Sequence, residues 1–149
     1  MKNKVQPSES AHERLYHSIK RIIEESRAIV SRVANSAMVR AYWEIGKLIV
    51  ESEQQGRQKA KYGKHQLDEI AQRLRQEFGR GFDASNLRNM RKFYLTFPIC
   101  DALRHKLSWT HFRLLMRIND PIAREWYANE SVAQSWSSRI LDRQMCKPF

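Results

Sequence analysis

Residues 67–97 read LDEIAQRLRQEFGRGFDASNLRNMRKFYLTF, and this stretch decides the fold. In both of its halves the apolar residues recur every three or four positions, which is typical of amphipathic helices. Glycines separate the halves at Gly79 and Gly81, and glycine favours helix C-termini. Asp83 then offers a side chain that can cap the start of a second helix. The stretch therefore predicts two helices, at about 64–78 and 84–97, that are joined by a short turn.

The apolar positions also predict which face each helix buries. We expect the first helix to pack through Leu67, Ile70, Ala71, Leu74 and Phe78, and the second through Leu87, Met90, Tyr94 and Phe97. Phe82 before the cap and Leu87 after it have the spacing of a hydrophobic staple, which fixes the angle at which the chain enters a helix. Pro98 ends the second helix.

Upstream of this pair, an apolar stripe with helical spacing extends over about 40 residues. It comprises Leu15, Ile19, Ile22, Ile29, Val33, Ala37, Ala41, Ile45 and Leu48, with Tyr42 and Trp43 beside it. Asn35 and Ser36 could break it, because their side chains compete for backbone hydrogen bonds. One long bent helix and a helical hairpin both remain open. The polar residues 54–59 indicate a loop.

Downstream, three shorter helices are predicted from their caps: one from Ser108, one from Asp120 with Pro121 at its first position, and one around Ser137. The expected buried residues of the first two are Trp109, Phe112, Leu115, Met116, Ile122, Trp126 and Tyr127, and the last helix includes Ile140 and Leu141. Core packing is also expected for all four tryptophans, Trp43, Trp109, Trp126 and Trp136.

No segment alternates like a half-buried strand, so the fold class is all-α. We expect a helical bundle that contains a helix-turn-helix-like unit, preceded by the long N-terminal helix or hairpin. A single domain is predicted over 10–145, after a disordered tail at 1–9. Its parts are the N-terminal helices (10–55), the helix-turn-helix (62–97) and the C-terminal helices (107–145).

Composition narrows the class of protein. The 149 residues include 27 Lys and Arg against 16 Asp and Glu, a net charge of +11, and 42% of them are hydrophobic, which is enough for a packed core. Two cysteines are too few for a disulfide framework. The sequence shows neither a signal peptide nor an apolar run that could span a bilayer. We therefore expect a soluble, cytoplasmic protein with no membrane partner.

The second helix of the pair has a polar face opposite its apolar one, formed by Ser85, Arg88, Asn89 and Lys92 with Arg91 on the flank. Many solvated helices look like this. However, residues 80–117 hold eight basic and two acidic residues, and this excess of +6 is more than half of the net charge. Such a concentration is typical of a surface that binds a polyanion.

These features predict a non-catalytic module that binds double-stranded DNA. Arginine and asparagine can make paired hydrogen bonds to purine edges in the major groove, so we expect Arg88 and Asn89 to contact bases. Phosphate contacts are expected from Arg80, Ser85, Arg91 and Lys92, with Lys64, Arg113 and Arg117 as further candidates. Because one small module binds weakly, a homodimer through the N-terminal stripe is expected as well.

The alternative is a helical protein–protein interaction module whose N-terminal stripe and tryptophan-rich tail dock a partner protein. No motif in the sequence supports a third interpretation, in which the chain is itself an enzyme. The five histidines are scattered, and Cys100, His105 and His111 have unequal spacings and no fourth ligand for zinc. Neither a Walker-type loop nor a GxGxxG loop occurs. We expect no catalytic residue, no metal and no cofactor.

The sequence contains YWEIG at 42–46, YGK at 62–64, FGRGF at 78–82 followed by Asn86, Leu87 and Met90, LSWTHF at 107–112, and the Asp-Pro pair at 120–121. In this order, these strings resemble the N-terminal domain of YhcG-type proteins. The resemblance covers about residues 12–144. In that family a helical domain of helix-turn-helix character precedes a PD-(D/E)xK nuclease domain, so the resemblance implies a DNA-binding role beside a nuclease. For the alternative interaction module, the resemblance implies that the docked partner is a separate nuclease subunit.

The resemblance does not extend to cleavage. A PD-(D/E)xK centre needs an Asp and an acidic-x-Lys pair to hold Mg²⁺ and activate water, and neither E-x-K nor D-x-K occurs in this sequence. The chain ends in MCKPF, and Pro148 would interrupt a helix leading into a nuclease domain. We therefore expect a truncated or frameshifted relative of these proteins.

Overall fold

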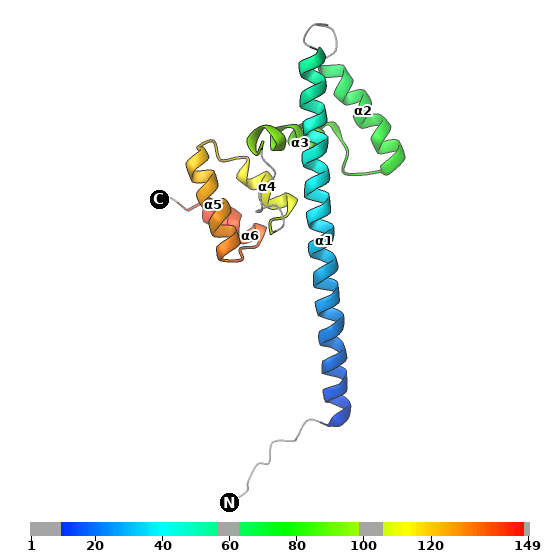
Figure 1. The fold of residues 1–149 in the computed structure, drawn as a ribbon, viewed down its shortest axis with the longest axis vertical. Helices are drawn as coiled ribbons and strands as arrows, with labels where there is room; N and C mark the ends of the chain where they lie inside the picture. The colour runs from blue at the N-terminus through cyan, green and yellow to red at the C-terminus, as the bar shows by residue number, and fades with distance from the viewer. Residues whose placement is uncertain (1–9, 57–62, 99–105, 148–149) are drawn as a thin grey trace, which may run out of the picture. The chain divides into compact units, whose positions relative to one another are not determined.

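The computed structural model describes residues 10–56, 63–98 and 106–147, and most of this part of the chain is helical (Figure 1). Its helices are α1 (Ala11–Gly56), α2 (Gly63–Phe78), α3 (Ala84–Thr96), α4 (Trp109–Leu115), α5 (Pro121–Ala133) and α6 (Ser138–Met145). No strand occurs within the described ranges, so the predicted all-α class is confirmed. The tail predicted at residues 1–9 lies outside them.

Helix α1 is one continuous helix of 46 residues. Asn35 and Ser36 lie inside it, which decides between the two alternatives in favour of a long helix. Side-chain competition at two residues is not enough to break a helix that is already propagating on both sides. Residues 54–56 of the predicted loop belong to α1 instead, and residues 57–59 lie outside the described residues. The chain divides into two compact units, one ending at Ala34 and one starting at Asn35.

The core of the second unit is centred on Phe93 of α3, whose side chain is fully buried. Its ring centroid lies 4.8 Å from that of Phe112 and 5.2 Å from that of Trp109, both of α4. Tyr42 of α1 packs edge-on against Trp109 at 5.0 Å. Aromatic pairs at these distances contribute beyond the area that they bury. One aromatic cluster therefore joins α1, α3 and α4.

The inner face of α3 differs in part from the prediction. Leu87 and Met90 are buried as expected, but Tyr94 and Phe97 are only half-buried, and Phe93, which was not predicted, lies at the centre. The reason is that α3 packs against several elements, so its buried face is wider and differently centred than a one-sided stripe. Trp43 of α1 donates from Nε1 to the Phe97 carbonyl over 2.7 Å and thereby closes the end of α3.

Gly46 brings the backbones of α1 and α3 close together. A Cβ atom at this position would overlap the carbonyl group of Met90 and lie 3.1 Å from Cβ of Tyr94. The buried side of α1 in this region follows Val39, Gly46 and Val50. Ala37, Ala41 and Leu48 of the apolar stripe are exposed, so the buried side of α1 in this region does not coincide with the stripe. A glycine without a side chain gave no hydrophobic signal to mark the contact.

Two other predicted inner faces are partly wrong. In α2, Ala71 is buried and Leu67 and Leu74 are half-buried, but Ile70 and Phe78 are 42% and 62% exposed. A helix that packs mainly against one neighbour buries only a narrow stripe.

In α5, Ile122 is 80% and Trp126 is 49% exposed, while Tyr127, Ala128 and Ser131 are buried instead. Small residues allow α5 to pack closely, and the Ser131 hydroxyl is satisfied because it donates to the Tyr127 carbonyl over 2.7 Å. Of the other tryptophans predicted in the core, Trp109 is buried, and Trp43 and Trp136 are half-buried and pack against the core.

Local capping signals located the helix starts correctly. Ser108 caps α4 and forms a reciprocal capping box with His111, Asp120 caps α5 with Pro121 in its first turn, and Ser137 caps α6. None of the helices in the described ranges combines the length and the apolar character needed to cross a lipid bilayer.

Candidate nucleic-acid interface

The turn between α2 and α3 depends on two glycines. Gly79 and Gly81 have φ angles of +79° and +109°, in the region that side chains with a Cβ rarely adopt. Apart from the glycine and its two neighbours in the chain, no heavy atom lies within 4 Å of the position that a Cβ would take at either residue, so the requirement is one of backbone conformation and not of space. The Gly79 amide donates to the Arg75 carbonyl over 2.9 Å and ends α2, as the sequence predicts.

Asp83 starts α3 as predicted. Its carboxylate accepts the backbone N–H of Asn86 over 2.8 Å, and the Asn86 side chain donates back to the carbonyl of Gly81. These two bonds tie the turn to the first turn of the helix, where the exposed amides attract negative charge. The direction in which α3 leaves the turn is therefore set by local hydrogen bonds.

The outer face of α3 is polar and exposed. Ser85, Arg88 and Lys92, spaced three and four residues apart, are all exposed, while Asn89 beside them is half-buried. Within the part of the chain that the structure describes, no carboxylate lies within ion-pair distance of Lys92. The predicted face is thus presented to solvent.

Two of the candidate arginines have acidic neighbours. Arg88 Nη1 lies 3.8 Å from Asp68 Oδ1 of α2, with both side chains more than half exposed. Arg91 makes a closer pair, because its Nε donates to Oε1 and Oε2 of Glu53 in α1 over 2.9 and 2.8 Å. Exposed pairs contribute about 0–1 kcal/mol and are screened by salt, so either arginine can exchange its carboxylate for another anion at small cost.

The remaining candidates lie outside α3. Arg80 is exposed in the glycine turn, Arg113 is one of only two exposed residues among the seven of α4, and Arg117 is exposed just after that helix. Lys64 is the second residue of α2, and its side chain lies outside the described residues. The structure therefore presents Arg80, Arg113 and Arg117 to solvent and does not place the Lys64 side chain.

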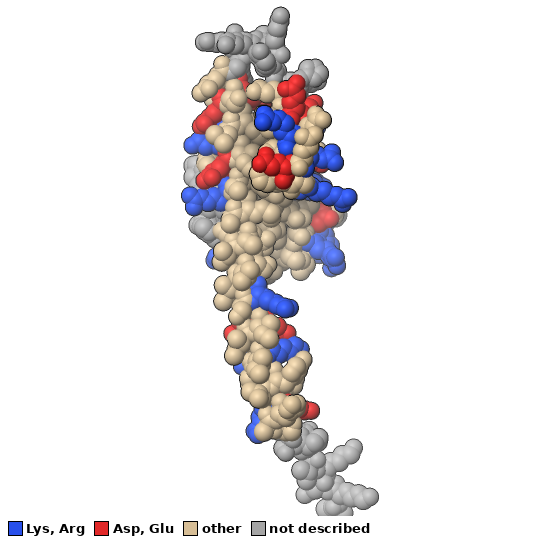
Figure 2. All heavy atoms as spheres, turned by 90° about the vertical axis from the view of Figure 1, so that its right-hand side faces the viewer, with Lys and Arg blue, Asp and Glu red and all other residues tan. Residues whose placement is uncertain are grey.

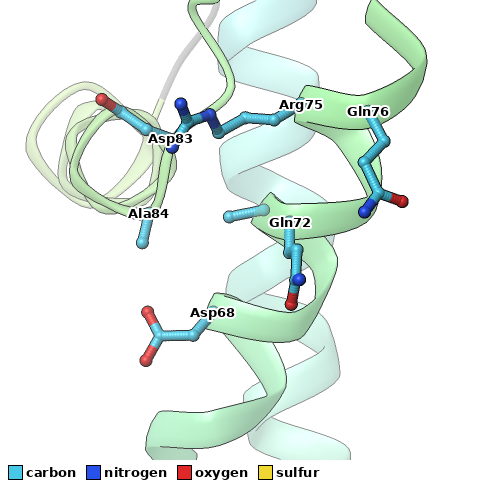
Figure 3. A pocket seen from close by; sticks show the side chains of 7 residues that line it. Asp68, Gln72, Arg75, Gln76, Asp83 and Ala84 are labelled. Carbon is cyan, nitrogen blue, oxygen red and sulfur yellow. The ribbon is translucent and has the colours of Figure 1, made fainter. Parts of the chain in front are cut away.

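A shallow hollow of about 450 Å³ lies between α2 and the start of α3 (Figure 3). Asp68, Gln72, Arg75, Gln76 and Asp83 line it, and the Arg75 side chain extends toward Asp83. The hollow is open to solvent and carries charges of both signs. Around α2 in general, Figure 2 shows Lys and Arg intermixed with Asp and Glu. This surface is thus a weaker candidate for binding a polyanion than the outer face of α3.

His111 has a structural role. Its Nδ1 lies 2.7 Å from the hydroxyl of Ser108, the N-cap of α4, and its Nε2 lies 2.8 Å from the Trp136 carbonyl. One ring nitrogen therefore closes the start of α4, and the other joins α4 to the chain before α6. Among the described residues no group of three or more His, Cys, Asp and Glu side chains is placed to hold a metal ion. Cys100 and His105 lie outside those residues.

Sequence reasoning missed Glu53 and Asp68 as partners of the basic face. In the sequence, 38 residues separate Glu53 from Arg91. No local pattern marks a pair formed across two helices, so this contact required the fold.

Comparison with known proteins identifies the family. The model of the DUF1016 N-terminal domain matches residues 18–148. In Escherichia coli (strain K12), the protein named "Putative nuclease YhcG" is 29% identical over an alignment 173 positions long, gaps included, which covers 94% of this chain and 46% of that protein. The chain thus spans less than half the length of this relative. No solved structure matches. The chain belongs to the DUF1016 N-terminal domain family, in agreement with the resemblance found in the sequence.

Proposed function

We propose that this chain is a non-catalytic module that binds double-stranded DNA through the outer face of α3. The observation that carries the proposal is the exposed row of Ser85, Arg88 and Lys92 on a helix whose exit from the glycine turn is fixed by the Asp83 cap. A helix displayed in this way, after a short turn and a supporting helix, is how helix-turn-helix proteins present a reading surface.

The dimensions suit the major groove. An α-helix with its side chains is about 10–12 Å across, which matches the roughly 12 Å width of that groove in B-form DNA, and the 13 residues of α3 extend about 20 Å. The deep, narrow major groove of A-form RNA would not admit a helix. Double-stranded DNA is therefore the nucleic acid that this face fits best.

Charge adds support. Between Gly79 and Arg117 the only acidic side chain among the described residues is Asp83, and its carboxylate is used by the cap. Arg80, Lys92, Arg113 and Arg117 are exposed in the same segment. Neutralising DNA phosphates with such side chains releases counterions and supplies most of the sequence-independent affinity.

Two comparisons support a role without catalysis. The matching family model is the one for the N-terminal domain, and the relative is more than twice as long as the part that aligns. The sequence also contains no acidic-x-Lys pair of the kind that nuclease centres of this class require. In our proposal the chain supplies DNA contacts, and cleavage belongs to another polypeptide segment.

Ser85→Glu tests the proposal with little risk to the fold. Ser85 is exposed in the first turn of α3, where a carboxylate stabilises the helix dipole but would repel phosphate. We expect Ser85→Glu to lower affinity for a duplex DNA probe at least tenfold and Ser85→Gln to change it less than threefold, as measured by fluorescence anisotropy. The proposal is rejected if wild type does not bind the probe, if it prefers duplex RNA, or if the two variants behave alike.

A further inference from the structure

Helix α1 carries a long exposed apolar stripe in the unit that ends at Ala34. Its members are Leu15, Tyr16, Ile19, Ile22, Ile23, Ile29, Val30 and Val33, each between 46% and 67% exposed. None of them belongs to the hydrophobic core cluster found in the described part of the chain. Monomeric proteins rarely leave so many large apolar side chains contiguous in water, so the stripe indicates an interaction surface.

The spacing of the stripe indicates that its partner is another helix. Positions 15, 19, 22, 26, 29 and 33 alternate steps of four and three, an average period of 3.5 residues, and hold Leu, Ile, Ile, Ser, Ile and Val. This repeat keeps one seam facing a partner helix along its whole length. Tyr16, Ile23 and Val30 recur every seven residues beside the seam and widen the apolar face.

No charged residue occupies the seam positions, and the charges elsewhere in this part of α1 nearly balance. Residues 11–34 hold five basic and three acidic side chains, so they carry only +2 of the net charge of +11. One basic and one acidic side chain, Lys20 and Glu24, lie 3.9 Å apart along the helix. In Figure 2, uncharged surface covers most of the visible side of this helix. Self-association is therefore not opposed by strong like-charge repulsion.

We propose that a second copy of this chain covers the stripe, through parallel, in-register pairing of residues 11–34. Eight side chains that are each about half exposed offer on the order of 800 Å² per copy, which is one partner's share of a standard interface. In-register pairing places Ser26, the polar residue of the seam, opposite Ser26 of the other copy, where the hydroxyls can hydrogen-bond. Against an unrelated apolar helix Ser26 would lack that match.

The mass of the full chain in solution tests this inference. We expect wild type to sediment at twice the monomer mass of 17.7 kDa at micromolar concentration. Ile22→Asp with Ile29→Asp places charges in the seam, so we expect the mass to fall twofold. The matched control is Glu24→Asp with Ser31→Asp on the opposite face of the helix, which should leave the dimer intact. Circular dichroism of each variant checks that the helices persist.

Orientation is tested in the same dimer. Ser26→Cys, in a chain with Cys100→Ser and Cys146→Ser, should form a disulfide-linked dimer on mild oxidation, whereas Ser31→Cys in the same background should not. A monomeric wild type, a dimer that survives both seam substitutions, or a failure of Ser26→Cys to cross-link would overturn the inference. So would a monomer that binds phosphatidylserine vesicles through this stripe. A monomer could still bind DNA through α3, so these failures are separable from failure of the proposed function.

Discussion

Nε of Arg91 lies 2.8 Å from Oε2 of Glu53, which connects the flank of α3 to the C-terminal part of α1. Both side chains are about 40% exposed, so water and salt reach the pair. The contact pairs a side chain of α3 with one of α1 in the free protein, and it also occupies one of the cations that our proposal assigns to phosphate. An exposed pair of this kind is weak enough to open when an anion competes.

Removing the carboxylate should strengthen DNA binding. In the Glu53→Gln variant, Arg91 does not have to break an ion pair before it binds a phosphate. We therefore expect the affinity for duplex DNA to rise two- to fivefold, which is equivalent to about 0.4–1 kcal/mol of binding free energy. The gain should vanish when Arg91 is also replaced by Ala. A double-mutant cycle measured by fluorescence anisotropy checks this. An equal gain with and without Arg91 would show that the effect is one of net charge alone.

Gly46→Ala should destabilise the protein. In an open helix this change stabilises by up to about 1 kcal/mol, but at Gly46 the new methyl group meets the Met90 backbone, which cannot rotate away. We expect a net loss of about 1–3 kcal/mol in the free energy of unfolding, measured by urea denaturation. Leu48→Ala, at a residue 66% exposed, should change it by less than about 0.5 kcal/mol. If Gly46→Ala raised the free energy of unfolding instead, α1 and α3 would have to lie farther apart in solution than the contacts at Gly46 indicate.

The Asp83 cap should contribute measurably to stability. Asp83→Ala leaves the Asn86 amide without its acceptor, so we expect a loss of about 1 kcal/mol in the free energy of unfolding. Asp83→Ser keeps an oxygen acceptor for this amide, so we expect it to retain most of the wild-type free energy of unfolding. Urea titrations of the three proteins compare them directly. Equal stabilities of the Ala and Ser variants would mean that the cap is not formed in solution.

Arg88 and Lys92 should differ in what they contribute to recognition. Arg88→Ala should reduce discrimination between a selected and a scrambled duplex by about 1–3 kcal/mol, because a bidentate contact to a base edge is lost. Lys92→Ala should weaken both duplexes by the same factor, since phosphates carry no sequence information. Duplexes selected from a randomised pool provide the probes. Equal loss on both probes with Arg88→Ala would remove Arg88 from base recognition.

Features set by neighbouring residues could be predicted from the sequence. The caps at Asp83, Ser108, Asp120 and Ser137 each need only a side chain and the next turn of backbone, and all four form. The end of α2 at Gly79 follows from one left-handed residue. The exposed face of α3 was also predicted, since a helix with Leu87 and Met90 inside must turn Arg88 and Lys92 outward.

Features set by contacts between distant segments could not be predicted. Phe93 is central only because α1 and α4 meet at that point of α3, and Gly46 matters only because another backbone crosses there. Hydrophobicity alone pointed to Ile122 and Trp126 in α5, but the close contact uses Ala128 and Ser131. The ion pair between Arg91 and Glu53 likewise joins helices whose order in sequence says nothing about their distance.

The salt dependence of duplex binding tests the central claim most directly. Arg80 and Lys92 are exposed candidates for phosphate contact, and Arg139 and Arg143 are exposed on α6, away from the proposed face in sequence. Each phosphate contact lowers the slope of log K against log salt by about 0.9, so we expect Arg80→Ala with Lys92→Ala to flatten the wild-type slope by about two. Arg139→Ala with Arg143→Ala should leave the slope unchanged. Equal slopes of log K against log salt for the wild type and both double variants would contradict the proposal that α3 and its glycine turn bind DNA phosphates.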